Sequence, residues 1–339
     1  MLRPDIVSTN DPTGLHLVYD DWPEIASKSY KLEKEKTNFD SIDHIVLLGM
    51  GGSGTISDIL VSILSKSNIH TSAVKGYHLP STVDKNTLVI ATSVSGETDE
   101  TITVFKDALK KNCKKIAFSK KQTGLDLFCK KNKIPHYTPD VYHSPRASLM
   151  SFLYYVLDTL GDILQIKQHD ITESILSLES LQKNINSSNL TSTNKSLDLA
   201  EWISGTPVIY YPWGLSSAAI RFKNSLNENA KMHVIAEDVI EASHNGIVAW
   251  EKNSKFQPIL IQGQDDYIKT KERWDILKEF FKSKDIEYKE IHSVNGSILT
   301  KIVNLIYLLD YATIYKAFLS NIDPAPVDAI NFFKNKLNK

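Results

Sequence analysis

The sequence predicts an α/β protein with two doubly wound, mainly parallel-sheet subdomains packed together and a C-terminal helix. Short apolar segments typical of buried strands alternate with amphipathic segments typical of helices, which is the pattern of a parallel sheet covered on both faces. This alternation occurs twice, on either side of a polar segment at 184–196 that is rich in Asn, Ser and Thr. The length of 339 residues also fits two domains of ordinary size.

The first half of the chain contains three predicted strand-and-helix units. Residues 1–40 form a polar lead-in, with short helices expected around 15–21 and 22–36. The first subdomain is expected at 41–165. Its predicted strands are His44–Leu48, Leu88–Ala91 and Lys115–Phe118, and its last helix runs from Ala147 to about Gln165.

The second half repeats the pattern after a connecting segment at 166–198, whose Asn-rich part is expected to be a surface loop. The second subdomain is expected at 199–320, and a C-terminal helix at 321–339. The predicted strands are Pro207–Tyr211, Gln257–Ile261 and Glu287–Ile291, and the predicted helices are 216–229, 271–284, 296–319 and 326–337.

Composition argues against several classes of protein. The net charge is −1, so no global field favours nucleic acid. No apolar run approaches the ~18 residues of a membrane helix, and the N-terminus lacks the apolar core of a signal peptide. Two cysteines, Cys113 and Cys129, do not form a disulfide framework. We therefore expect a cytoplasmic protein that binds neither nucleic acid nor membrane.

A glycine-rich turn, Gly49-Met50-Gly51-Gly52-Ser53-Gly54, follows the first predicted strand and opens a helix. Glycines let backbone N–H groups approach an anion, and the helix N-terminus adds positive partial charge. The spacing also fits a dinucleotide-binding turn, but 69–77 contains no carboxylate to hold a ribose. A tight turn with a purely structural role stays open as an alternative.

A second turn carries three hydroxyls, from Ser93, Ser95 and Thr98, around Gly96. Hydroxyls and free N–H groups at a helix start suit a phosphate monoester, because they need no large positive charge. Ordinary helix capping explains one of these hydroxyls but not all three. Together the two turns predict a phosphate site made by Gly51, Gly52, Ser53, Ser93, Ser95 and Thr98.

Three further side chains are candidates for acid–base chemistry. A carboxylate and an imidazole in one pocket are the minimal pair for moving a proton on carbon and opening a sugar ring, and Glu228 and His244 provide them. Arg146, one of only four arginines, suits a developing enediolate or a phosphate. On local sequence alone, Glu228 could instead pair with Lys231 on a helix surface, and Arg146 could hold its loop by an ion pair. The histidines lack metal-ligand spacing, so no metal is predicted.

These motifs resemble a known family. The Gly49–Gly54 turn followed by Ser93–Thr101 is similar to the SIS, or sugar isomerase, domain, and more narrowly to the archaeal and bacterial bifunctional phosphoglucose/phosphomannose isomerases. The resemblance covers about 44–337. The other matching motifs, in the family's order, are Pro145-Arg146-Ala147, Glu228-Asn229-Ala230-Lys231, His244-Asn245 with Trp250, and Asp323-Pro324 leading to Lys334.

The resemblance implies an aldose–ketose isomerase that converts glucose 6-phosphate and mannose 6-phosphate to fructose 6-phosphate through a cis-enediol, without a cofactor. It implies that Glu228 moves the proton, that Arg146 stabilises the enediolate or holds the phosphate, and that His244 opens the ring. In the family this histidine reaches a neighbouring subunit's pocket, which implies a homodimer. Lys334 matches a lysine that assists ring opening, with Lys336 as an alternative.

Two departures from the family's pattern bear on this interpretation. Glu97 stands where the family usually has Asn, and we expect its charge to point away from the phosphate loop. Gly246 stands where the residue after His-Asn is commonly Glu. Three alternatives remain: an isomerase narrowed to one sugar phosphate, a non-catalytic SIS sensor of sugar phosphates, and a dinucleotide-dependent enzyme.

Overall fold

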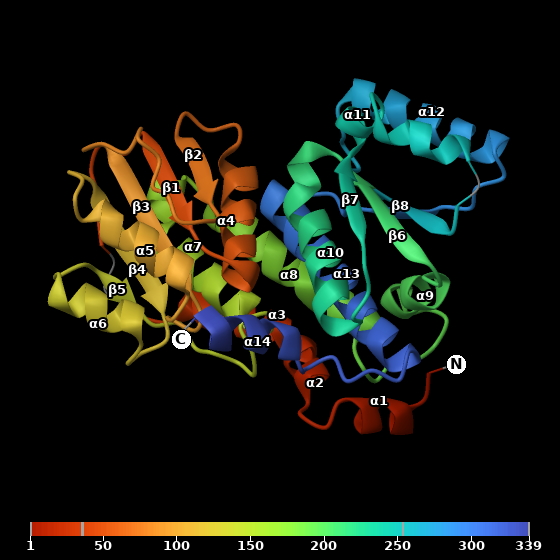
Figure 1. The fold of residues 1–339 in the computed structure, drawn as a ribbon, viewed down its shortest axis with the longest axis horizontal. Helices are drawn as coiled ribbons and strands as arrows, with labels where there is room; N and C mark the ends of the chain where they lie inside the picture. The colour runs from red at the N-terminus through yellow and green to blue at the C-terminus, as the bar shows by residue number, and fades with distance from the viewer. Residues whose placement is uncertain (1, 35–36, 253, 338–339) are drawn as a thin grey trace. The chain divides into compact units, whose positions relative to one another are not determined.

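The structure is a computed structural model that describes residues 2–34, 37–252 and 254–337 (Figure 1). The chain forms two compact units, and each contains one parallel sheet. The β1–β5 unit consists of Asp21–Glu179 and Asn295–Val303, and the β6–β9 unit of Met1–Asp20, Ser180–Val294 and Asn304–Lys339. Two of the four boundaries, after Glu179 and after Val303, fall inside the long helices α8 and α13, which contribute residues to both units.

The first sheet has five parallel strands in the order β2-β1-β3-β4-β5. The three predicted strands are confirmed, whereas β2 and β5 were missed. Every residue of β1 and β3 is buried, so these strands form the centre of the sheet. The strands are β1 His44–Leu48, β2 His70–Val74, β3 Thr87–Ser93, β4 Lys114–Ser119 and β5 His136–Tyr137.

Helices cover both faces of this sheet. One face packs against α5 and α6 in a single apolar cluster. On the other face, Phe118 of β4 meets Tyr155 of α7 with ring centroids 6.4 Å apart. Trp22 begins α3, and its Nε1 donates to the carbonyl oxygen of Ala147 at 2.8 Å. The helices are α3 Trp22–Lys31, α4 Gly51–Leu64, α5 Asp99–Ala108, α6 Gly124–Lys131, α7 Leu149–Leu164 and α8 Gln168–Ile185.

The helix expected at 22–36 ends earlier than predicted. α3 stops at Lys31, and Leu32 is extended, with φ −65° and ψ 120°. Residues 35 and 36 lie outside the described part of the chain. The expected loop at 184–196 is shorter than predicted, because α8 runs to Ile185 and Asn194 already caps the next helix by accepting from the backbone N–H groups of Ser196 and Leu197.

The second sheet has four parallel strands in the order β7-β6-β8-β9. The three predicted strands are again confirmed, and the edge strand β7 was missed. The strands are β6 Thr206–Tyr211, β7 Ile235–Asp238, β8 Phe256–Gln262 and β9 Lys289–His292. The helices are α1 Pro4–Asn10, α2 Leu15–Asp20, α9 Lys195–Trp202, α10 Ser216–Asn229, α11 Val239–Ala242, α12 Ile268–Ser283, α13 Ile298–Leu319 and α14 Asp328–Leu337, with 3₁₀ turns η1 Trp213–Leu215 and η2 Gly246–Glu251.

Helix α13 is a central core helix. By length and composition it could span a membrane, since an 18-residue window reaches a mean hydropathy of 1.3, so the expectation that no apolar segment approaches this length was wrong. This 18-residue segment is 89% buried within the protein, however. The core helix of a soluble protein meets the same criteria of length and hydropathy. Helix α13 also carries the fully buried Asp310 and Thr313, which bond to α10 as described below.

Candidate active site

The two predicted phosphate turns lie side by side. β1 and β3 are hydrogen-bonded neighbours, so the turns that follow them meet at the same edge of the sheet. Ser53 in the first turn joins them directly, because its Oγ accepts from the backbone N–H of Val94 at 3.1 Å. The hydroxyl is therefore used to fix the second turn against the first.

The hydroxyls of the second turn do not cap the helix that they precede. Thr98 is the N-cap residue of α5 but makes no side-chain cap bond, and its Oγ1 lies 3.0 Å from Ser93 Oγ instead. Ser95 Oγ accepts from the N–H of Glu97 at 3.3 Å. Met50, the N-cap of α4, likewise makes no side-chain cap bond. Neither N-cap side chain therefore bonds to the first-turn N–H groups of α4 and α5, which is the arrangement that an anion site at a helix N-terminus requires.

Gly96 is required where it stands. Its φ is +69°, and a Cβ would lie 2.0 Å from Thr123 Oγ1. We expect Gly96→Ala to lower the free energy of unfolding by about 2 kcal/mol or more and to weaken anion binding at the predicted phosphate turns. Gly51→Ala is the matched control for stability, since its φ of +53° is similar but nothing lies within 4 Å of the added Cβ. If urea unfolding showed equal losses of unfolding free energy for the two variants, the contact with Thr123 would not contribute to the effect.

Arg146 lies beside the first turn. A Cβ at Gly52 would meet the Arg146 Cα at 3.4 Å and the Pro145 carbonyl oxygen at 3.1 Å, so the two segments pack backbone to backbone. Ser148 fixes the turn that carries the arginine, because its Oγ accepts from the N–H of Tyr142 at 2.9 Å. Arg146 is 6% exposed. The structure therefore brings the phosphate turns and Arg146 together within the β1–β5 unit.

Glu228, His244 and Lys334 belong to the other unit. Glu228 is half-buried in the last turn of α10. Three other α10 residues, Arg221, Ser225 and Asn229, bond to α13: Arg221 Nη2 and Ser225 Oγ each lie 2.7 Å from the Asp310 carboxylate, and Asn229 Nδ2 donates to Thr313 Oγ1. Residues at spacings of four share one helix face, so this stripe fixes the orientation of α10 and hence of Glu228.

The Arg221 guanidinium is held charged. Burial alone would lower its pKa, but the Asp310 carboxylate and, among other groups, the nearby Glu228 charge raise the pKa above its ordinary value. Glu228 therefore lies within the electrostatic reach of a buried, permanently charged arginine.

Lys231 anchors the segment that leads to α14. Its Nζ donates to the backbone oxygens of Glu228 at 2.7 Å and Pro326 at 2.8 Å, so the end of α10 is tied to the C-terminal segment. Lys334 and Lys336 follow on α14, which has no buried residue. Lys336 Nζ lies 5.8 Å from the centroid of the Phe332 ring.

His244 is presented at the surface. It follows the one-turn helix α11, and its backbone N–H donates to the Glu241 carbonyl at 2.9 Å. The neighbouring Asn245 is held by Glu241 Oε1, which accepts from its Nδ2 at 2.8 Å. The backbone of this segment is thus fixed while the imidazole is exposed, and within the described chain no side-chain hydrogen bond of His244 is found. Among the described residues, no group of three or more His, Cys, Asp or Glu could hold a metal ion.

Comparison with known proteins identifies the family. The sequence model of the SIS domain matches residues 39–152, and that of the bacterial phospho-glucose isomerase C-terminal SIS domain matches residues 192–337. A bifunctional phosphoglucose/phosphomannose isomerase of Caldicellulosiruptor bescii is 33% identical over 331 residues, 93% of this chain and 96% of that protein. The chain belongs to the bifunctional phosphoglucose/phosphomannose isomerase family.

Further comparisons agree with this family. The protein of the same name from Aquifex aeolicus is 30% identical, over 87% of this chain and 90% of its own. The fold is also similar to that of a solved hypothetical protein from Thermus thermophilus, with a TM-score of 0.73 and 13% identity, over 98% of this chain and 92% of that one. The SIS-domain match contains the phosphate turns and Arg146, and the C-terminal match contains Glu228, His244 and Lys334.

The structure explains the first departure from the isomerase family's pattern. Glu97 does not face the phosphate turn. Its Oε1 accepts from the N–H of Gly124 at 2.6 Å, so the carboxylate caps the N-terminus of α6. The expectation that this charge points away from the phosphate site is confirmed.

The second departure involves a carboxylate that the sequence analysis missed. A Cβ at Gly246 would lie 2.4 Å from Glu237 Oε2, so the space where a side chain at 246 would begin is filled by a carboxylate from β7. Glu237 lies beside the segment that carries His244. The signal that could have revealed it is the short Ile235–Asp238 strand, which is too polar to stand out in a hydropathy pattern.

Proposed function

We propose that this protein interconverts glucose 6-phosphate and mannose 6-phosphate with fructose 6-phosphate through a cis-enediol. The observation that carries the proposal is the phosphate cradle beside Arg146: two adjacent helix N-termini without side-chain caps, joined by Ser53 and edged by the hydroxyls of Ser93 and Thr98. This arrangement supplies N–H and O–H donors to a phosphate monoester. Its combination with Glu228 and His244, in a chain of this family, supports isomerisation rather than binding alone.

The proposed chemistry gives each candidate residue a separate role. His244 moves a proton between the ring oxygen and the C1 hydroxyl, which opens the ring. Glu228 then removes the C2 proton of the open aldose, and the C1 carbonyl takes up the electron pair as an enediolate. A proton then passes from the C2 hydroxyl oxygen to the C1 oxygen, and Glu228 returns its proton to C1 as C2 becomes the carbonyl, which gives the ketose. Arg146 stabilises the enediolate charge, and Lys334 or Lys336 assists ring opening.

We propose that the active enzyme is a homodimer in which His244 serves the neighbouring subunit. The exposed imidazole, on a backbone that is itself fixed, supports a role outside its own subunit. Co-expression of Glu228→Gln and His244→Ala chains should then restore roughly a quarter of wild-type activity, since half of random dimers are mixed and each has one intact site. Mixed dimers as inactive as either parent would mean that His244 acts within its own chain.

The activity itself is tested by incubating purified protein with fructose 6-phosphate, without added metal, and measuring glucose 6-phosphate and mannose 6-phosphate separately. We expect both products. Glucose 6-phosphate alone would indicate a narrowed isomerase, and neither product with fructose 6-phosphate still bound would indicate a sensor. We also propose that the enzyme is cytoplasmic and uses no cofactor.

A further inference from the structure

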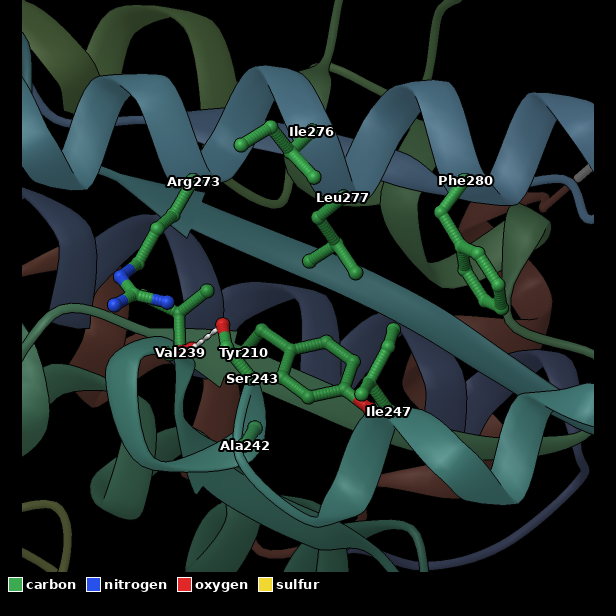
Figure 2. A pocket seen from close by; sticks show the side chains of 9 residues that line it. All are labelled: Tyr210, Val239, Ala242, Ser243, Ile247, Arg273, Ile276, Leu277 and Phe280. Atoms are coloured by element: carbon green, nitrogen blue, oxygen red, sulfur yellow. Dashed lines mark hydrogen bonds between the residues drawn. The ribbon is translucent and has the colours of Figure 1, made fainter.

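The β6–β9 unit contains a cavity that the proposed reaction does not use. It has a volume of about 250 Å³ and lies between α12, α11 and the end of β6 (Figure 2). Figure 2 shows the Arg273 side chain at one end of it and the Phe280 ring at the other, with the Tyr210 ring along the wall between them. Leu277 and Ile247 complete an apolar interior.

The polar groups of the cavity wall are satisfied with one exception. Ser243 Oγ donates to the Val239 carbonyl at 2.6 Å, and the Tyr210 hydroxyl accepts from Trp250 Nε1 at 2.7 Å. Arg273 is half-buried, yet no hydrogen bond or ion pair of its guanidinium is found in the described part of the chain. A guanidinium that is partly removed from water favours an anionic partner, and its planar fork matches a carboxylate.

Size and lining then restrict the ligand. A cavity of 250 Å³ exceeds the ~150 Å³ that holds benzene and is below the size typical of drug-sized ligands. It therefore suits one ring with a short arm. The aromatic walls of Tyr210 and Phe280 favour an aromatic ring through edge and offset-stacked contacts. We propose that this cavity is a binding site for a small aromatic carboxylate, with its ring between Tyr210 and Phe280 and its carboxylate on Arg273.

The site adjoins the segment that carries the proposed ring-opening histidine. Ser243 lines the cavity, and His244 is the next residue in the chain. A bound ring would pack against α11, from which His244 extends. An effect of the bound ligand on ring opening by His244 rests on the proposed function, whereas binding in the cavity does not.

The test is calorimetric titration of the full chain with 3-phenylpropionate. We expect a dissociation constant below about 1 mM, a reasonable value for a ligand of this size. The neutral amide of the same acid, and the Arg273→Met variant with the acid, should both bind about ten- to a hundredfold more weakly. Ala242→Leu, which fills the cavity from α11, should abolish binding without lowering the melting temperature. The backbone amide signal of His244 should shift on titration of the wild type only.

Two results would overturn the proposal. One is the absence of binding to the wild-type protein, including the case in which a second copy of the chain already fills the cavity. The other is equal binding of the acid and its amide, or equal binding by wild type and Arg273→Met, which would make the contact with Arg273 irrelevant. The titration measures binding and needs no turnover. A protein without isomerase activity would therefore contradict the proposed function, but the binding result would still test the cavity.

Discussion

Glu228→Gln should lower kcat on fructose 6-phosphate by about a thousandfold or more, because the amide cannot accept the carbon-bound proton. Binding of fructose 6-phosphate should change little, since the proposed phosphate site consists of other residues, in the turns after β1 and β3. Steady-state kinetics together with calorimetric binding of the substrate separates the two effects.

The matched control is Glu201→Gln, an exposed carboxylate on α9 of the same unit. It should retain wild-type kinetics. If Glu228→Gln weakened binding as much as it slowed turnover, Glu228 would be a structural residue and the assigned mechanism would be wrong.

Arg221→Met should lower the free energy of unfolding by about 3–5 kcal/mol, because it leaves the Asp310 carboxylate buried without its cationic partner. Arg221 and Asp310 side chains are 3% and 0% exposed, and two guanidinium nitrogens, Nε and Nη2, contact the carboxylate. Urea denaturation at neutral pH measures the loss.

Two further variants test whether the loss of stability comes from a buried, unpaired charge. The double variant Arg221→Met, Asp310→Leu should recover much of the stability, since no buried charge remains. Lys269→Met breaks an exposed pair with Glu272 and should cost less than about 1 kcal/mol. A loss of similar size for Arg221→Met and Lys269→Met would contradict the account of α10 as a helix fixed by a buried ion pair.

The elements predicted from sequence are those whose pattern is local. The strand at His44–Leu48 was predicted with its observed bounds, because an entirely buried parallel strand is a continuous apolar run that stops at a glycine. β2 and β7 were missed for the converse reason. His70–Val74 and Ile235–Asp238 are edge strands with exposed or half-buried residues throughout, so they show no such run.

In the candidate site, too, the features that could be predicted are those set by local sequence. The two glycine- and hydroxyl-bearing turns could be placed from sequence, since their spacing is a property of one short segment, and their binding of phosphate stays a prediction. The capping of α6 by Glu97, 27 residues before Gly124, depends on tertiary packing. So do the contact of Glu237 with Gly246 and the pairing of Arg221 with Asp310, which are 89 residues apart. Local sequence suggested an ion pair of Glu228 with Lys231, but it could not show that Lys231 Nζ also donates to the backbone oxygen of Pro326, 95 residues away.

The most direct test of an enediol mechanism through Glu228 is hydrogen exchange in heavy water, followed by proton NMR. Wild-type protein incubated with fructose 6-phosphate should exchange one of the two C1 protons for deuterium, and the aldose products should carry deuterium at C2. Glu228→Gln should show neither exchange nor product. Product that stays free of deuterium after many turnovers at equilibrium would contradict an enediol intermediate, and exchange that persists in Glu228→Gln would assign the proton transfer to another residue.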